Sequence, residues 1–358
     1  MGRNSGKYVL IYRLGGIGDA VVALPAIRLI RKNYPDCRLV LFNLSVADNL
    51  AQAELYGEPG LFAEKHFALP PHNLRQKLAL YGKFLRVGFR HRYAALYCFA
   101  PARPRVLDWL FRILHRARAR LCLLPERDNR LPIHEEYLEF LRREGMRPDG
   151  DCLAFPVSGE NREKAAALLR KAAPGREAPL VAFGIGGAEQ VCRWPLDKYS
   201  ELLAKLRREF AFIPVYLGGE NDRENARKLM NGHGGFFLYD TPCRDAAATI
   251  AFLGGCRCYI GNDTGSAHLA AAAGIPCAVI YSAHNLPAEK WHPFGRDNLY
   301  FRGDAECAGC EKRVCPRGDP APCLTLVAVD TVFAQVRDAW LAGRMPAPFQ
   351  SPGGRTVP

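Results

Sequence analysis

The chain has 358 residues, of which 49% are apolar and 24% are charged, and a mass of 39.8 kDa. These proportions are ordinary for a folded protein of about two domains, and they exclude collagen-like, coiled-coil and disordered classes. No run of 18 apolar residues occurs, so we expect no transmembrane helix, and the first apolar run is too short for a signal peptide.

The net charge is +13, with 49 Lys and Arg against 36 Asp and Glu. A basic balance favours anionic partners, whether nucleic acid, an anionic membrane face or phosphorylated substrates. The excess is uneven, because residues 83–120 contain ten Lys or Arg and one acid, Asp108. This stretch is either a solvated helix face or a surface that meets phosphate groups.

Short apolar runs alternate with helical segments along the first half of the chain. The run at 8–12, YVLIY, is apolar throughout, as a buried parallel strand requires. Further strands are expected at 38–43, 94–99 and 120–124. Helices are expected at 20–33, 73–91, 104–117, 134–144 and 161–171. Sequential alternation of this kind predicts a parallel, doubly wound sheet.

A break with two prolines at 172–179 separates this half from a second α/β half. Its expected strands lie at 180–183, 213–217, 236–239, 258–260 and 277–281. Its expected helices lie at 195–209, 221–230, 244–254, 265–273 and 329–342. We therefore predict Rossmann-like domains over 1–174 and 175–328, a C-terminal helix over 329–344 and a Pro/Gly-rich, disordered tail over 345–358. Ligands of such sheets bind at the carboxyl ends of strands.

A glycine-rich turn, Leu14 to Asp19 (LGGIGD), follows the first predicted strand. Its glycines let the backbone approach a ligand, and the following helix N-terminus favours anions. A dinucleotide fingerprint fails in detail, because Val21 stands where a small residue is needed and Asn43 replaces the ribose-binding acid. Asp19 is then either a carboxylate presented for chemistry or a helix cap.

A polar turn, Gly261 to His268 (GNDTGSAH), lies between the strand at 258–260 and a helix of small residues. A strand, a polar turn and a helix N-terminus together favour phosphate binding, and hydroxyls of Thr264 and Ser266 add donors. The alternative is a plain capping turn with a buried helix histidine. Two weaker turns of similar form are 183–188, with Arg193 after it, and 217–220, which ends in Glu220.

Four of the 13 cysteines cluster as Cys307-x2-Cys310-x4-Cys315-x7-Cys323. The other nine are scattered and are typical of buried, reduced thiols, so we expect a cytosolic protein. Four thiols in seventeen residues indicate a small metal site, and a loop of free or paired thiols is the alternative.

Taken together, these motifs resemble glycosyltransferase family 9, the ADP-heptose heptosyltransferases of bacterial lipopolysaccharide assembly. The resemblance runs from about Tyr8 to Trp340. It is carried by R-x-G-x-x-G-D-x-x-x-x-x-P-A from Arg13 and by N-D-T-G-x-x-H-L-A-A-A-x-G-x-P from Asn262. It implies an α/β GT-B fold with two facing Rossmann-like doubly wound parallel-sheet domains, and inverting, metal-independent sugar transfer from a nucleotide donor.

The resemblance also implies roles for particular residues. Asp19 is the general base, in an N-terminal acceptor-binding domain whose Gly16 and Gly18 line the acceptor. The donor-binding residues of the C-terminal nucleotide-sugar domain are Gly186, Gly187, Arg193, Glu220, Asp263, Thr264, Gly265 and His268. Arg103 and Arg105 follow the strand at 94–99 and are expected to meet acceptor phosphates or carboxylates.

One departure concerns the donor site, because the family's Lys-x-Trp-Pro is here Cys192-Arg193-Trp194-Pro195. Arg193 is the replacement cation from a neighbouring position. No catalytic cofactor is expected. Because related autotransporter heptosyltransferases carry a four-cysteine iron site, Cys307, Cys310, Cys315 and Cys323 are expected to hold structural zinc or iron.

The expected partners are an ADP-heptose donor and a lipid-linked or glycan acceptor at the anionic inner face of the inner membrane, with no nucleic acid. The alternative from another class is a non-catalytic nucleotide- or nucleic-acid-binding protein with a cysteine metal knuckle. A nicotinamide-dependent oxidoreductase is a third hypothesis. The incomplete dinucleotide-binding motif after the first strand argues against it.

Overall fold

The computed structural model describes residues 7–45, 55–58, 60–100, 105–115, 120–123, 131–148, 155, 157–174, 178–187, 189–284, 288–295 and 297–345. The chain divides into two compact units, Met1–Ala154 and Phe155–Val357. Over the described ranges, no helix is both long and apolar enough to cross a bilayer.

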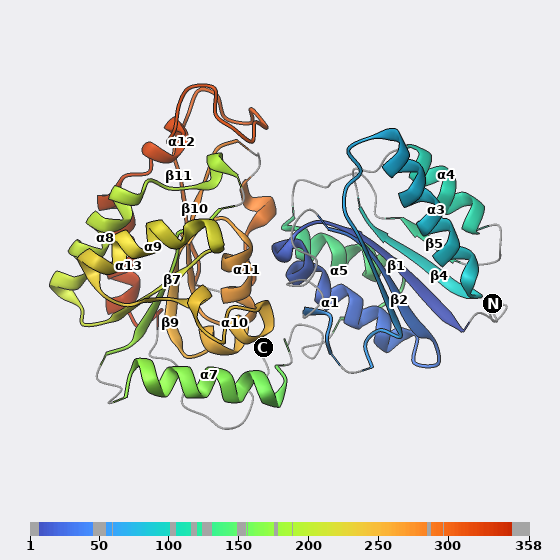
Figure 1. Cartoon of the computed structure of the whole chain (residues 1–358), viewed down its shortest axis with the longest axis horizontal. Helices are drawn as coiled ribbons and strands as arrows, with labels where there is room; N and C mark the ends of the chain where they lie inside the picture. The colour runs from blue at the N-terminus through green and yellow to red at the C-terminus, as the bar shows by residue number, and fades with distance from the viewer. Residues whose placement is uncertain are drawn as a thin grey trace. The chain divides into compact units, whose positions relative to one another are not determined.

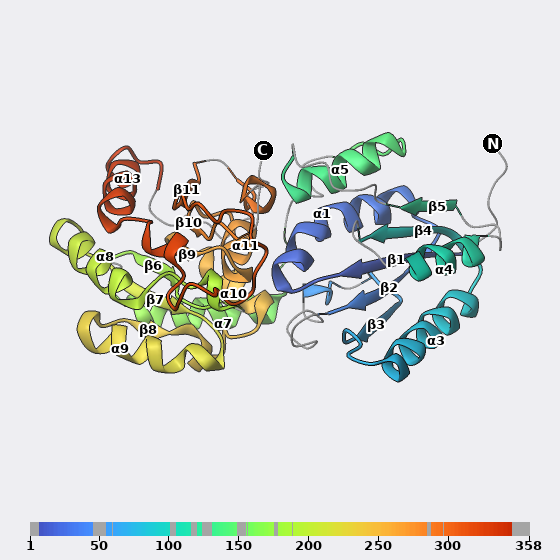
Figure 2. The same cartoon turned by 90° about the horizontal axis from the view of Figure 1, so that it is seen from above.

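The first unit is built on a five-stranded parallel sheet in the order β3-β2-β1-β4-β5 (Figure 1). Its strands are β1 (Tyr8–Leu14), β2 (Arg38–Leu44), β3 (Glu64–Ala68), β4 (Tyr93–Phe99) and β5 (Arg120–Leu123). Its helices are α1 (Ile17–Asn33), α3 (Leu74–Arg90), α4 (Arg105–His115) and α5 (Ile133–Arg143). Helices α1 and α5 pair on one face, and α3 and α4 pair on the other (Figure 2).

Because helices cover both faces, the central strands are apolar runs without alternation. All seven residues of β4 are buried, as are the five interior residues of β1. On the face covered by α3 and α4, four aromatic rings meet at centroid distances of 5.1 to 5.8 Å. They belong to Tyr12, Phe42, Phe84 and Phe111. These contacts fix α3 and α4 against the sheet.

The second unit is built on a six-stranded parallel sheet in the order β11-β10-β9-β6-β7-β8. Its strands are β6 (Leu180–Gly184), β7 (Ile213–Leu217), β8 (Phe236–Phe237), β9 (Cys256–Asn262), β10 (Cys277–Tyr281) and β11 (Leu299–Arg302). Its α-helices are α7 (Gly159–Ala172), α8 (Leu196–Glu209), α9 (Arg223–His233), α10 (Ala246–Leu253), α11 (Gly265–Ala272), α12 (Pro322–Thr325) and α13 (Val329–Leu341). Its 3₁₀ turns are η1 (Gln190–Cys192), η2 (Glu220–Asp222), η3 (Leu238–Asp240) and η4 (Ala288–Trp291).

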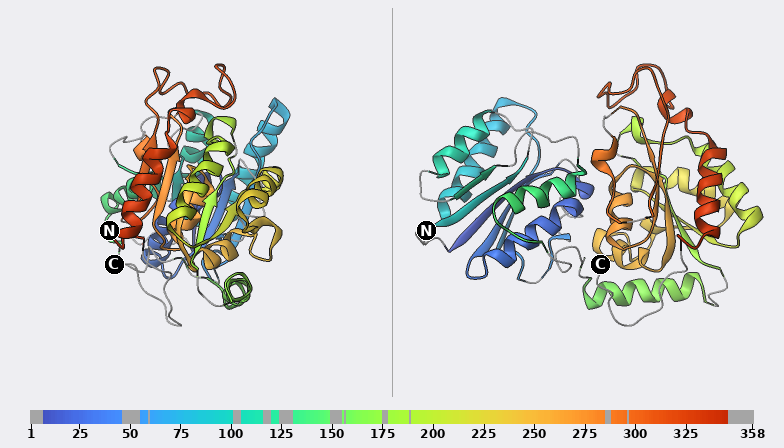
Figure 3. Two further views of the ribbon diagram at one scale, coloured as in Figure 1. Left: turned by 90° about the vertical axis from the view of Figure 1, so that its left-hand side faces the viewer. Right: turned by 180° about the vertical axis from the view of Figure 1, so that it is seen from behind.

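The helices of this unit form two groups on the sheet. Helix α8 packs against α9 and α13, whereas α10 packs against α7 and α11 (Figure 3). Between β11 and α12, residues 303–321 form a long connection without helix or strand. Two doubly wound parallel sheets confirm the predicted α/β fold class.

Two strands, β3 and β11, were not expected from the sequence. Each is the outermost strand of its sheet, and each is only partly buried. In β3, Glu64, Lys65 and His66 interrupt any apolar pattern. Edge strands need no continuous apolar run because one side of their backbone is unpaired.

The boundary between the units also differs in position from the predicted 174/175. Helix α7 lies in the second unit, where it packs on α10, and a Cβ on Gly255 would lie 2.6 Å from the Leu169 Cδ1 of α7. Of the predicted tail, 345–358, only Met345 is described, and its side chain is buried. The other tail residues lie outside the described ranges.

In each unit, the polar turns lie at the carboxyl ends of the parallel strands. Strand order reverses between β1 and β4 in the first sheet, and between β9 and β6 in the second. Such switch points are where open α/β sheets bind their ligands. The turns after β1, β6, β7 and β9 all contain residues that the sequence singled out.

Candidate functional site

The turn after β1 brings the Asp19 carboxylate to the N-terminus of α1. Oδ2 of Asp19 accepts a hydrogen bond from the Gly16 backbone N–H at 2.7 Å. Gly15 has a φ of +136°, and a Cβ on it would lie 2.3 Å from the Asp19 Cγ. Only glycine fits there, because the conformation is unfavourable for other residues and the carboxylate fills the space. Asp19 therefore caps the helix, and its half-buried carboxylate lies where a helix terminus favours negative charge.

A buried arginine supports this turn from the sheet side. Arg13, the next-to-last residue of β1, is 1% exposed. Its guanidinium donates to the Tyr56 hydroxyl at 2.5 Å and to the Gly16 carbonyl at 3.3 Å. Burial, and after it the charge of Asp19, raise the pKa of Tyr137 in α5. In the sequence, Arg13 stands out only as the first residue of a motif. In the structure, its hydrogen bonds hold the turn in place.

The other residues predicted to bind the acceptor lie at or near the first turns of helices, apart from Arg103. Gly16 is the N-cap of α1 and Gly18 lies in its first turn. Arg105 is the exposed first residue of α4, after β4, which pairs with β1. Arg103 lies outside the described residues. Arg105 and Asp19 therefore follow the carboxyl ends of two neighbouring parallel strands, β4 and β1.

In the second unit, the turns after β6 and β7 interlock. A Cβ on Gly186 would lie 2.6 Å from the Asp222 Oδ2 and 2.9 Å from the Gly218 Cα. Asp222, 4% exposed, accepts from the Gly219 backbone N–H at 2.8 Å. Its other oxygen pairs with Arg193 Nη1 at 2.7 Å. Asp222 was not predicted as a site residue, yet it joins both turns.

Arg193 and Glu220, both expected to contact the donor, already have protein partners. Besides Asp222, the Arg193 guanidinium donates to the Gly187 carbonyl through Nη2 at 2.6 Å, and its side chain stays one-third exposed. Glu220 is exposed and accepts two hydrogen bonds from Arg223, at 3.0 and 3.1 Å. These bonds lower the pKa of Glu220, so the carboxylate is ionised.

Asn262, at the end of β9, is fully buried and holds three segments together. Its Oδ1 accepts from the Trp194 backbone N–H at 3.0 Å and from the Tyr199 hydroxyl at 2.9 Å. Its Nδ2 donates to the Gly186 carbonyl at 3.0 Å and to the Ile185 carbonyl at 3.3 Å. The first polar residue of the predicted phosphate turn is thus a structural one.

The rest of that turn leads directly into α11. Asp263, Thr264 and Gly265 are half-buried, and the side chain of Thr264, the N-cap, makes no capping hydrogen bond to α11. The Thr264 hydroxyl lies 2.9 Å from that of Ser266, which lies 3.0 Å from the Tyr259 hydroxyl. The helix N-terminus therefore offers main-chain N–H groups and two hydroxyls at one place.

His268 lies on the buried side of α11 and is 3% exposed. Burial lowers its pKa to about 4, so the imidazole is neutral at physiological pH. Its Nδ1 atom has no hydrogen-bond partner among the described residues. Any contribution of His268 to a phosphate site is therefore through hydrogen bonding or packing, and not through charge.

Cys192, which stands where the family often has lysine, ends the η1 turn. Burial, and after it the nearby carboxylates of Asp263 and Glu189, raise the pKa of the Cys192 thiol to about 12. The side chain is therefore a neutral thiol next to Asp263, and it provides no cation there.

The four clustered cysteines differ in their exposure. Cys310 is exposed, Cys323 is buried, and Cys307 and Cys315 are half-buried. Within the described ranges, one group of three or more His, Cys, Asp or Glu side chains has all its ligand atoms within 4.8 Å of one another. None of these four cysteines belongs to it. The four-cysteine metal site stays a prediction.

Comparison with known proteins gives a family match that lies almost wholly in the second unit. Residues 153–319 match the family model for glycosyltransferase family 9 (heptosyltransferase). A curated relative, lipopolysaccharide heptosyltransferase 1 of Pseudomonas aeruginosa, is 29% identical over 147 residues, which make up 41% of this chain. The match spans 40% of the length of that relative.

Solved structures are similar over nearly the whole chain. The family 9 glycosyl transferase of Veillonella parvula has a TM-score of 0.73 at 15% identity, covering 94% of this chain and 98% of that one. Escherichia coli ADP-heptose heptosyltransferase II has a TM-score of 0.64 at 15% identity, with coverages of 94% and 99%. Dodecameric, iron-containing TibC from E. coli, in complex with ADP-D-β-D-heptose, has a TM-score of 0.53 at 16% identity, with coverages of 93% and 76%.

These likenesses confirm the GT-B class of the two parallel-sheet domains. The family match covers the turns after β6, β7 and β9, where Asp222, Asn262 and Asp263 lie. Over residues 153–319, the chain is therefore similar to glycosyltransferase family 9 (heptosyltransferase).

Proposed function

We propose that the protein is an inverting, metal-independent heptosyltransferase. It transfers a heptose from ADP-heptose to a lipopolysaccharide-core or related glycan acceptor, with the first unit binding the acceptor and the second the nucleotide sugar. The observation that carries this proposal is the N-terminus of α11, with Asp263, Thr264 and Ser266, inside the part of the chain that matches the family.

On the acceptor side, the proposal gives Asp19 the role of general base. Inversion requires a group that takes the proton of the acceptor hydroxyl as that oxygen attacks the sugar. The bond from Gly16 orients the Asp19 carboxylate, and Arg13 holds the turn beneath it. Arg105, and Arg103 beyond the described residues, are proposed to meet acidic groups of the acceptor.

On the donor side, the departing diphosphate has to be stabilised as its charge develops. The α11 N-terminus and the hydroxyls of Thr264 and Ser266 supply positive dipoles and donors without a metal ion. Gly186 and Gly187 let the main chain approach the nucleotide, and Glu220 accepts from the ribose hydroxyls. Arg193 acts mainly by holding the glycine turns through Asp222, and its side chain remains one-third exposed.

A donor screen by isothermal titration calorimetry tests this proposal. We expect ADP to bind more tightly than UDP or GDP, and Thr264→Ala to weaken ADP binding roughly 5- to 10-fold, the worth of a hydrogen bond of about 1 kcal/mol. Thr325→Ala is a matched control, because the Thr325 hydroxyl donates to the Pro322 carbonyl in α12, away from α11 in sequence. Equal affinity of the Thr264 variant and the parent for ADP would remove Thr264 from the donor site.

His268→Ala, proposed to weaken ADP binding as well, needs a separate control. Because the pKa of His268 is about 4, protonation of this residue contributes nothing to ADP affinity between pH 6 and 8. His268→Gln, which keeps a hydrogen-bonding side chain of similar size, should restore part of the lost affinity. An unchanged ADP affinity in His268→Ala would leave the residue as core packing only.

We also propose that the protein works in the cytoplasm, against the anionic inner face of the inner membrane. Helices α3 and α4 pack side by side and expose large apolar side chains together with basic ones. The exposed apolar residues are Leu74, Leu78, Phe89, Val106 and Trp109. The exposed basic residues of α3 are Arg75, Lys77, Lys83, Arg86 and Arg90. A surface of apolar and cationic side chains favours an anionic lipid interface.

Vesicle co-sedimentation tests the membrane proposal. We expect the double variant Leu78→Gln, Trp109→Gln to bind vesicles containing phosphatidylglycerol at least about 10-fold more weakly, because two large apolar side chains no longer enter the interface. Leu326→Gln is the control, since Leu326 is as exposed but lies in the second unit. Binding of the parent to neutral vesicles as tightly as to anionic ones would contradict the role of the basic residues.

A further inference from the structure

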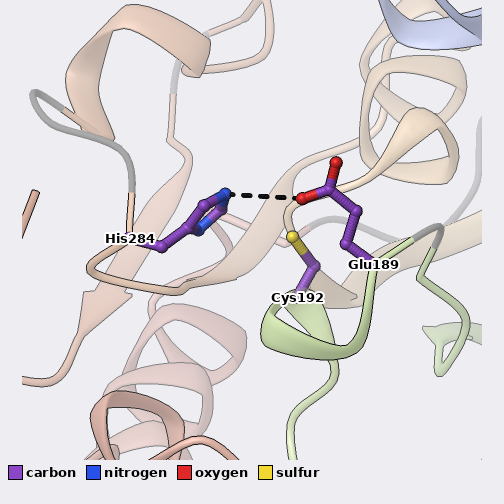
Figure 4. A group of neighbouring side chains, drawn as sticks. All are labelled: Glu189, Cys192 and His284. Atoms are coloured by element: carbon purple, nitrogen blue, oxygen red, sulfur yellow. Dashed lines mark ion pairs between the residues drawn. The ribbon is translucent and has the colours of Figure 1, made fainter. Parts of the chain in front are cut away.

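Three side chains of different chemistry meet between the loops that follow β6 and β10 in the second unit. They are the carboxylate of Glu189, the thiol of Cys192 and the imidazole of His284, and their ligand atoms all lie within 4.8 Å of one another. Figure 4 shows that the three side chains point toward a common space. The His284 Nε2 lies 3.8 Å from the Glu189 Oε2.

The imidazole is held in one orientation by its other nitrogen. The Ser282 hydroxyl lies 3.0 Å from the His284 Nδ1 and also accepts from the His284 backbone N–H at 3.2 Å. The side chain is buried, and the His284 carbonyl accepts from the Glu311 N–H at 2.9 Å. This arrangement leaves Nε2 directed at Glu189 and Cys192. An imidazole whose second nitrogen is hydrogen-bonded in this way is the usual form of a histidine metal ligand.

The other two side chains come from one anchored turn. Between Glu189 and Cys192, the Gln190 side chain accepts from the Cys315 backbone N–H at 2.9 Å and donates to the Gly318 carbonyl at 3.2 Å. Arg313 lies 3.4 Å from Oε1 of Glu189, which leaves Oε2 on the side of His284. Glu189 and Cys192 thus meet His284 from a turn that is fastened to the cysteine-rich segment.

The charge around the thiol also favours a cation. Besides Glu189, the Asp263 carboxylate acts on Cys192 through its negative charge. Negative neighbours oppose an isolated thiolate, whereas a divalent ion is attracted by both carboxylates and stabilises the thiolate at the same time. Thiolate, imidazole and carboxylate together are a zinc donor set, since magnesium and calcium prefer oxygen ligands alone.

From this juxtaposition we infer that Glu189, Cys192 and His284 bind one zinc ion. The ion ties the turn at 189–192 to the loop that follows β10 and so fixes one side of the donor turn. Zinc takes the place of the Cys192 proton, which leaves to solvent on binding. The inference stands apart from the chemistry proposed for Asp19, because the site contributes to the shape of the second unit and needs no step of sugar transfer.

The test uses the full chain, stripped of metal and then titrated with zinc alone. We expect about one zinc per chain by elemental analysis in the parent. Cys192→Ser and His284→Ala should lose it. With Co²⁺ as a spectroscopic probe, a thiolate-to-cobalt charge-transfer band should appear in the parent and be missing in Cys192→Ser. Ser282→Ala should weaken zinc binding about 10- to 100-fold, because it removes the hydrogen bond that orients His284.

Cys310→Ser is the matched control, since Cys310 is exposed and belongs to the four-cysteine cluster. It should keep the zinc and the cobalt band. Metal that persists in Cys192→Ser and His284→Ala but is lost in Cys310→Ser would assign the ion to Cys307, Cys310, Cys315 and Cys323 and overturn the inference. Failure of the parent to bind zinc would overturn it as well. Should Cys192→Ser not fold, Glu189→Gln gives the same readout with an almost isosteric side chain.

Discussion

Asp19→Asn is expected to lower turnover by about 10²–10⁴-fold, the effect of losing a general base. An amide does not take the proton of the acceptor hydroxyl, but its oxygen still accepts the 2.7 Å hydrogen bond from the Gly16 N–H. The fold of the first unit should therefore persist. Steady-state transfer from ADP-heptose, together with circular dichroism of the purified variant, measures both effects.

Two controls separate catalysis from capping in this experiment. Asp108→Asn changes another acid in the first turn of a helix of the same unit and should leave turnover near that of the parent. The affinity of Asp19→Asn for ADP should also be unchanged, since the nucleotide is proposed to bind the second unit. Turnover of Asp19→Asn close to that of the parent would reduce Asp19 to a helix cap.

Asn262→Ala is expected to destabilise the second unit by about 3–5 kcal/mol. The substitution leaves the Trp194 N–H and two carbonyls without this partner, whereas the Tyr199 hydroxyl keeps the Gly184 carbonyl. Each buried orphan costs about 1–3 kcal/mol, part of which is recovered by rearrangement. Denaturant unfolding followed by tryptophan fluorescence measures this loss, because Trp194 is one of the reporters.

Asn231→Ala is the control for this second prediction. Asn231 is exposed on α9, and its removal should change stability by less than about 0.5 kcal/mol. A loss at Asn262 as small as that at Asn231 would show that water or neighbouring side chains replace the four hydrogen bonds.

Much of the sheet architecture was predictable from the sequence, because buried parallel strands are apolar runs of characteristic length. Strands at 213–217 and 277–281 were predicted with the bounds that the structure has. The edge strands β3 and β11 were not, since half-exposed strands carry no such run. The start of the second unit was placed after α7, because a Pro/Gly break in sequence gives no information on which sheet a helix packs against.

The positions of the candidate site residues in the chain were predictable, but the side chains that they contact were not. The turns after β1 and β9 were found because polar residues after an apolar strand are unusual. That buried Arg13 supports the turn of Asp19 involves the hydroxyl of Tyr56, which is far away in sequence. Likewise Arg193 pairs with Asp222, 29 residues later, only because β6 and β7 are neighbours in the sheet. The group of Glu189, Cys192 and His284 spans two loops, so no local motif predicts it.

Asp222 and Arg193 bond to the two glycine turns and to each other. Flexible glycine loops ordinarily lose conformational entropy when a ligand fixes them, and that loss weakens binding. Here the turns after β6 and β7 are immobilised by folding itself, through a carboxylate and a guanidinium that each contact main-chain atoms. For the nucleotide binding proposed here, ordering of these loops should therefore cost little free energy, and more of the interaction free energy should remain as affinity.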